Sequence, residues 1–72
     1  MPVVPSLLRA ARVAANLSRT EAGAQLGKSY PAMEAYERGA VVPPGNVLVA
    51  MARLYGVAVE ELCRDIDPAG AA

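Results

Sequence analysis

Residues 17–39, LSRTEAGAQLGKSYPAMEAYERG, carry the pattern that decides the fold. The stretch opens with a helix start, because Ser18 stands three residues before Glu21, the spacing at which each side chain satisfies a free backbone donor of the other. Gly27 suits the end of this helix, since glycine takes up the left-handed conformation without strain. The sequence therefore predicts a short helix over residues 19–26.

A second helix follows after a short turn. Ser29 suits its cap, and Pro31 suits its first turn, because proline lacks the backbone N–H that the first turn leaves unpaired. Gly39 ends this helix, which we expect over residues 30–37. Two short helices joined by a turn that contains glycine form the helix-turn-helix pattern, which is used to bind DNA.

An earlier helix is expected over residues 6–16, with Ser6 as its cap, after an N-terminal extension of residues 1–5. Apolar residues recur in this helix at helical spacing and leave Arg9 and Arg12 on other parts of its surface. These apolar residues are Leu7, Leu8, Ala11 and Ala15.

Two more helices are expected after the loop at residues 40–45, whose two prolines exclude a helix. Asn46 is expected to cap a helix over residues 46–55, which is apolar on nearly all sides and is therefore expected to be buried on more than one side. A short helix over residues 58–64 follows, with two glutamates near its positive end.

The length of 72 residues allows one domain, which we place at residues 6–64, before a flexible tail at residues 65–72. The expected fold class is all-α, with five helices. No apolar run approaches the roughly 20 residues that span a bilayer, so no membrane segment is expected. No secretory signal is visible either, and we expect a cytoplasmic protein of bacterial or phage type, associated with the nucleoid.

The net charge is zero, but the charges are unevenly distributed. Residues 1–38 carry five basic and three acidic side chains, a net charge of +2. Residues 39–72 carry two basic and four acidic side chains, a net charge of −2. The helix-turn-helix half is therefore the positive half, which favours a phosphate backbone but predicts weak electrostatic affinity.

The residues that most enzymes use are missing or badly spaced. The chain has no histidine, and its one cysteine, Cys63, is expected to be a small core residue, so neither a metal site nor a cofactor is expected. Residues 23–29, GAQLGKS, have three residues between the glycines where a phosphate-binding loop needs four. Adjacent glutamates on a helix do not face one another, so an acid–base pair is not expected. We expect no enzyme.

The order of these elements resembles the lambda-repressor/Cro-like helix-turn-helix family over roughly residues 8–62. Arg12 stands five residues before the Leu17–Ser18 entry to the second helix, as the family's arginine does. The other matching positions are Leu26–Gly27, residues 36–39 (YERG), Pro44, residues 54–57 (LYGV) and Glu61–Leu62. The resemblance implies a compact five-helix DNA-binding domain.

The resemblance also implies a largely buried ion pair between Arg12 and Glu37. A planar guanidinium meets a carboxylate through two hydrogen bonds, and loss of one partner strands the other charge. The alternative is two solvated charges that lie far apart.

The chain departs from the family pattern at several positions. Arg19 stands where the family has a glutamine that touches phosphate, and arginine suits the same role. The family's alanine in the middle of the second helix is Gly23, which preserves close packing but lowers helix propensity by about 1 kcal/mol. Ala22 replaces a leucine and leaves a smaller core. The loop at residues 40–43 carries no cation for phosphate.

By matching position, the residues that face base edges at the start of the third helix would be Ser29, Tyr30, Pro31, Ala32, Glu34 and Ala35. Arg19, Lys28 and Arg38 would flank them as phosphate contacts. No arginine, asparagine or glutamine lies on this face, so the strong paired contacts to guanine and adenine are missing. The alternative is that all of these are ordinary surface residues. Met33 and Tyr36 are expected to face the core.

These observations predict a small transcriptional regulator that binds duplex DNA through the helix at 30–37. A homodimer through the last two helices is expected, because one helix in one half-site buries little surface. Its candidate contacts are Val49, Val59 and the segment around Leu62. The competing interpretation is a protein-interaction module on the same fold, whose partner is another repressor, a sigma factor or a toxin.

Overall fold

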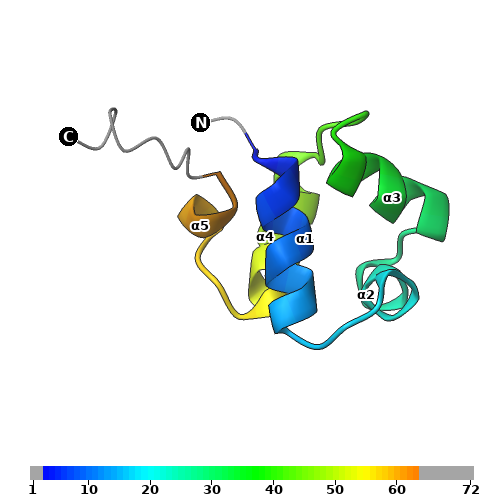
Figure 1. The fold of residues 1–72 in the computed structure, drawn as a ribbon, viewed down its shortest axis with the longest axis horizontal. Helices are drawn as coiled ribbons and strands as arrows, with labels where there is room; N and C mark the ends of the chain where they lie inside the picture. The colour runs from blue at the N-terminus through cyan, green and yellow to red at the C-terminus, as the bar shows by residue number, and fades with distance from the viewer. Residues whose placement is uncertain (1–2, 64–72) are drawn as a thin grey trace.

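The computed structural model describes residues 3–63, and within them it contains five α-helices and no strand (Figure 1). The helices are α1 (Pro5–Ala14), α2 (Arg19–Leu26), α3 (Tyr30–Arg38), α4 (Gly45–Tyr55) and α5 (Val59–Cys63). The expected all-α, five-helix fold class is confirmed. The expected tail at residues 65–72 lies outside the described residues. No helix within residues 3–63 has the length and apolar character that a membrane span requires.

Helix α2 begins and ends as its sequence predicts. The Ser18 hydroxyl accepts a hydrogen bond from the Glu21 backbone N–H at 3.0 Å, and the Ser18 backbone N–H donates to Glu21 Oε1 at 2.9 Å. The backbone N–H of Ser18 and then its hydroxyl lower the pKa of Glu21 below its usual value, because both stabilise the charged carboxylate. Gly27 ends α2 with φ +68°.

Helix α3 is capped in the same way. The Ser29 hydroxyl accepts from the Ala32 backbone N–H at 3.3 Å, and Pro31 lies in the first turn. The helix runs to Arg38, one residue further than expected, and Gly39 ends it with φ +83°. Both caps are local, which is why the sequence alone locates these helices.

The expected boundaries of α1 are wrong at both ends. The helix begins at Pro5, and Ser6 lies inside it without acting as a cap. Proline at the first helical position has a fixed φ and no N–H to satisfy, so it starts the helix without a side-chain cap. Asn16, with φ +63°, turns the chain out of the helix two residues after Ala14, because asparagine tolerates the left-handed conformation.

The expected cap of α4 is also wrong. The helix begins at Gly45, and no side chain caps it. The Pro44 carbonyl accepts the first helical hydrogen bond, from the Leu48 N–H at 2.9 Å, so Pro44 is the N-cap residue and Asn46 lies exposed inside the first turn. Helix α5 begins one residue later than expected, at Val59, and Arg64 lies outside the described residues.

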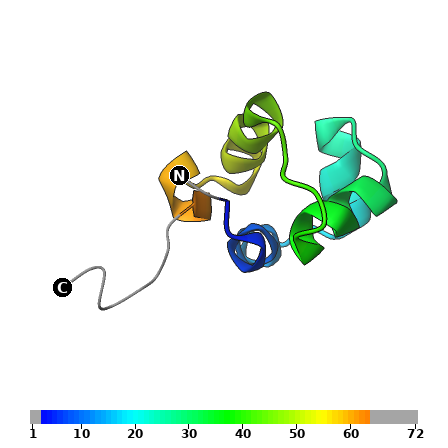
Figure 2. The same cartoon turned by 90° about the horizontal axis from the view of Figure 1, so that it is seen from above.

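Helix α1 lies in the middle of the molecule, with α5 on one side and α2 and α3 on the other (Figures 1 and 2). It contacts α3, α4 and α5, and α2 contacts α3 and α4. Helix α4 is buried on more than one side, as expected. It leaves Val49 and Ala50 exposed, and its buried residues are Val47, Leu48, Met51, Ala52 and Tyr55. The enclosed core consists of Leu8, Ala22, Met33, Tyr36, Val47, Leu48, Met51, Ala52, Tyr55, Leu62 and Cys63.

The burial of individual side chains tests several expectations from the sequence. Met33, Tyr36 and Cys63 are buried, as expected, and Cys63 is a free thiol. Leu62 is wrong as an exposed dimer contact, because only 1% of it is exposed. A leucine on a five-residue helix fills the core of so small a domain, since α5 has little other apolar surface with which to dock.

The two ends of the described chain are joined by a backbone hydrogen bond. The Val4 N–H donates to the Leu62 carbonyl at 3.0 Å. This bond ties the residue before α1 to the last turn of α5.

Gly23 has no room for a side chain. A Cβ at this position would lie 2.6 Å from the Lys28 carbonyl oxygen, and the Gly23 carbonyl itself accepts a hydrogen bond from the Lys28 N–H at 2.8 Å. The turn therefore packs directly on the backbone of α2. Glycine is required here, a stronger constraint than the preserved packing that the sequence suggests.

Replacement of Gly23 with alanine is expected to destabilise the protein. Overpacking against a backbone atom costs about 1–3 kcal/mol, which outweighs the roughly 1 kcal/mol gained in helix propensity. Thermal unfolding measures the difference. Gly45→Ala is the matched control, because nothing lies within 4 Å of its Cβ position, and it is expected to leave the melting temperature equal or higher. Equal stability of the two variants would contradict the close contact.

Candidate nucleic-acid interface

One face of α3 is open to solvent. Tyr30, Glu34 and Arg38 are exposed and recur every fourth residue, so they form one stripe along the helix. Met33 and Tyr36 are buried on the opposite side. Helix α3 therefore packs on the core through one side and presents its other, polar side to solvent.

The other residues predicted for base contact differ in exposure. Ser29 and Pro31 are exposed at the start of α3, although the Ser29 hydroxyl is already used as the helix cap. Ala32 and Ala35 are half-buried, and Ala32 packs against the core. The accessible part of the face therefore lies mainly at Tyr30, Pro31 and Glu34.

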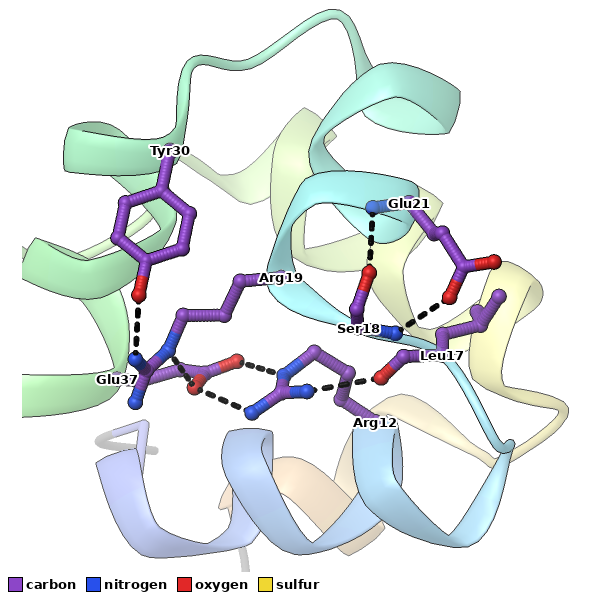
Figure 3. A network of polar contacts seen from close by, with 7 residues as sticks. All are labelled: Arg12, Leu17, Ser18, Arg19, Glu21, Tyr30 and Glu37. Carbon is purple, nitrogen blue, oxygen red and sulfur yellow. Dashed lines mark hydrogen bonds and ion pairs between the residues drawn. The ribbon is translucent and has the colours of Figure 1, made fainter.

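Arg12 and Glu37 form a nearly buried ion pair between α1 and α3 (Figure 3). Arg12 Nε donates to Glu37 Oε2 at 2.6 Å, and Arg12 Nη2 donates to Glu37 Oε1 at 3.1 Å. The exposed fractions of the two side chains are 9% and 1%. Arg12 Nη1 also donates to the Leu17 carbonyl at 2.8 Å, which fixes the link between α1 and α2. This is the pair that the family resemblance implies.

Glu37 holds a second arginine. Arg19 Nε donates to Glu37 Oε1 at 2.9 Å, so one buried carboxylate binds guanidinium groups from α1 and α2 (Figure 3). Arg19 Nη1 donates to the Tyr30 hydroxyl at 3.1 Å, and the Arg19 guanidinium lies 5.8 Å from the centre of the Tyr30 ring. We call Arg12, Glu37, Arg19 and Tyr30 the arginine–glutamate chain. It runs from the interior to the exposed start of α3.

The contacts of the arginine–glutamate chain shift the pKa values of Glu37 and Arg19. Burial alone raises the pKa of Glu37, but the hydrogen bonds from Arg12 and Arg19 outweigh it, and the pKa lies below its usual value. The bond to Glu37, and then the bond to Tyr30, raise the pKa of Arg19 further above its already high value. Both shifts favour the charged forms of Glu37 and Arg19.

The predicted phosphate contacts surround this face. Arg19 is half-buried at the start of α2, Lys28 is half-buried in the turn, and Arg38 is exposed at the end of α3. Beyond α3, Val41 and Val42 are exposed, with 51% and 72% of their surface accessible. The basic side chains thus lie around α3, and the loop that follows it is apolar.

The comparisons with known proteins agree with this arrangement. A family model described as a helix-turn-helix domain matches residues 6–64. The chain belongs to this family. Among solved structures, the helix-turn-helix domain is similar to the P22 c2 repressor protein, crystallised in complex with the synthetic operator 9T in the presence of Tl+. The TM-score is 0.76 at 22% sequence identity, over 86% of this chain and 94% of that chain. No curated protein sequence matches the chain.

Sequence reasoning missed part of the interface of this helix-turn-helix domain. It treats Arg19 as a free phosphate contact, whereas the structure shows that Glu37 and Tyr30 already bind two of its nitrogens. The available signal was an arginine at the first position of α2, directly after the cap and within a few residues of Leu17, which Arg12 contacts. Only the packed structure shows that Glu37 serves both arginines.

Proposed function

We propose that this helix-turn-helix domain is a transcriptional regulator that binds duplex DNA with α3 in the major groove. The open stripe of Tyr30, Glu34 and Arg38, on a helix braced by the core, is the observation that carries the proposal. A rigid helix with an exposed amino end suits the major groove, which is about 12 Å wide.

Roles follow from the chemistry of each side chain. Arg38 and Lys28, with the remaining donors of Arg19, contact phosphate oxygens and set the position of the domain. Glu34 accepts from the cytosine N4 amino group, and Tyr30 offers its ring to a thymine methyl and its hydroxyl to a base. The remaining predicted positions contribute apolar or backbone contacts.

Fluorescence anisotropy of labelled mixed duplexes at about 50 mM salt tests the proposal. Three phosphate contacts per subunit give a slope of log affinity against log salt of about −2.7, and two subunits double it. Salt-sensitive binding is the expected result. A chain that binds no duplex at this salt concentration would overturn the proposed function.

Neutralising single cations should flatten this dependence. Lys28→Ala and Arg38→Ala are each expected to reduce the steepness of the slope by about 0.9 per subunit, because one fewer counterion is released. Arg53→Ala, on the exposed side of α4, serves as the charge-matched control and should leave the slope unchanged. Equal slopes for all four proteins would remove Lys28 and Arg38 from the interface.

We also propose that two copies pair through α4 and α5. Val49 is 40% exposed on α4, whereas Val59 is half-buried at the start of α5 and packs partly against the core, so Val49 is the main exposed contact after Leu62 is excluded. Two half-sites supply the buried area that one helix lacks. Sedimentation equilibrium tests the pairing: we expect a dimer that Val49→Glu weakens, and a monomer throughout the high micromolar range would exclude it.

The exposed valines after α3 support a second candidate function. Val41 and Val42 lie in the loop that the family resemblance expects to carry cations for phosphate, and they expose apolar surface there. This favours a protein-interaction module that binds another repressor, a sigma factor or a toxin. The anisotropy titration separates the two functions, because only the DNA-binding regulator gives salt-sensitive affinity for duplexes.

A further inference from the structure

The hydrogen bond between Arg19 and Tyr30 has a fixed direction. An arginine side chain has only donors, so the Tyr30 oxygen must accept from Arg19 Nη1. The single proton of the Tyr30 hydroxyl is therefore not used within the pair. It is left to be donated to another molecule.

The rest of the arginine–glutamate chain holds this direction in place. Glu37 is fixed by two hydrogen bonds from Arg12, and it binds Arg19 through Nε on the side away from Tyr30 (Figure 3). The positive charge of Arg19, 3.1 Å from the Tyr30 oxygen, opposes the approach of a second donor to that oxygen. It also polarises the hydroxyl and strengthens its proton as a donor.

Resting on the proposed function, we propose that Tyr30 is a specificity-determining residue that donates to a base edge and discriminates against cytosine. Tyr30 is 48% exposed at the first position of α3, so its hydroxyl is accessible to a partner. In the major groove, guanine presents O6 and N7, adenine presents N7, and thymine presents O4 as acceptors. Cytosine presents only an amino donor. Because Arg19 already occupies the Tyr30 oxygen as an acceptor, the hydroxyl is best placed to donate, which suits guanine, adenine and thymine and disfavours cytosine.

Arg19 and Glu37 act in this selection as positioning residues. Neither needs to touch a base, because Glu37 holds Arg19, and Arg19 occupies the acceptor of Tyr30. The buried Arg12–Glu37 ion pair is thereby connected to the exposed face of α3. The connection consists of two hydrogen bonds, one from Arg19 to Glu37 and one from Arg19 to Tyr30. Arg19 and Glu37 therefore affect which base the domain prefers. A purely structural role would change the stability of the domain but not its base preference.

Selection from a library of randomised duplexes tests this assignment, with the full chain and with three variants. The intact chain should enrich duplexes that lack cytosine at one position of each half-site. Tyr30→Phe should lose that preference by about fivefold, the equivalent of one hydrogen bond, while other positions keep theirs. Arg19→Met should admit cytosine at the same position, because the Tyr30 oxygen is then free to accept. Arg53→Ala, which lies outside the proposed interface, should leave this position unchanged.

The outcomes separate this inference from the proposed function. If the intact chain enriches duplexes and Tyr30→Phe weakens binding to all of them equally, Tyr30 contacts phosphate and the inference is overturned while the proposed function stands. Enrichment unchanged in Arg19→Met would overturn the role of the donor direction. If the intact chain retains no duplex from the library, both the proposed function and the inference fail.

Discussion

Replacement of Glu37 with alanine is expected to lower the free energy of unfolding by about 3–5 kcal/mol, because it leaves the Arg12 charge buried without a partner. A domain of this size has a total stability of only about 4–11 kcal/mol. The Glu37 carboxylate binds Arg12 and Arg19 together, so its loss also removes the ion pairs that link α3 to α1 and α2. Urea denaturation followed by circular dichroism measures the change.

Two further variants show whether the cost comes from the stranded charge. Glu34→Ala removes an exposed glutamate from the same helix and should change stability by less than about 0.5 kcal/mol. The double variant Arg12→Met, Glu37→Leu removes both buried charges and should recover most of the lost stability, because apolar pairs replace buried ion pairs well. A double variant no more stable than Glu37→Ala would show that the hydrogen bonds themselves, and not the stranded charge, dominate.

Tyr55 is expected to make the protein sensitive to alkali. Its hydroxyl is buried and has no hydrogen-bond partner among the described residues. Burial, followed by the charge of Glu37, raises the pKa of Tyr55 from 10 to about 12, against the opposing charge of Arg12. Because the folded protein keeps the proton longer than the unfolded chain, stability is intact below pH 10 and falls as the pH rises toward 12. The full loss is on the order of 3 kcal/mol.

Tyr55→Phe should remove this alkaline loss. At neutral pH the variant should be as stable as the original or slightly more stable, because the deleted hydroxyl is a buried polar group without a partner. Tyr30→Phe is the control, since Tyr30 is exposed, and it should retain the alkaline loss. If Tyr55→Phe costs about 1 kcal/mol at pH 7, the hydroxyl has a hydrogen bond in solution, and the expected alkaline loss would shrink accordingly.

Most of the fold could be predicted because the signals that start and end its helices are local in sequence. Ser18 and Ser29 cap their helices through residues three positions later, and Gly27 and Gly39 end them with positive φ. Such signals lie within one turn of sequence, so no tertiary information is needed. The helix starts at Pro5 and Gly45 were missed because Val4 and Pro44, the residues before them, have no polar side chain that could mark a cap in the sequence.

The site was less predictable, because its contacts join residues far apart in the chain. The family resemblance supplied the pairing of Arg12 with Glu37, 25 residues apart. Nothing local indicates that Arg19 shares the same carboxylate, or that the Tyr55 hydroxyl is buried without a partner. The requirement for glycine at Gly23 likewise depends on the Lys28 carbonyl folding back onto α2. These features depend on packing between helices, which composition and spacing do not encode.

The backbone bond between Val4 and Leu62 makes the protein suitable for circular permutation. A short flexible linker from residue 63 to residue 3 would replace a junction that is already closed, so the entropy lost in closing it is small. New ends opened in the exposed loop at residues 40–42 would interrupt no helix. Such a rearranged chain should keep α3 packed on α1 and α2, because the new ends leave the contacts between these helices in place.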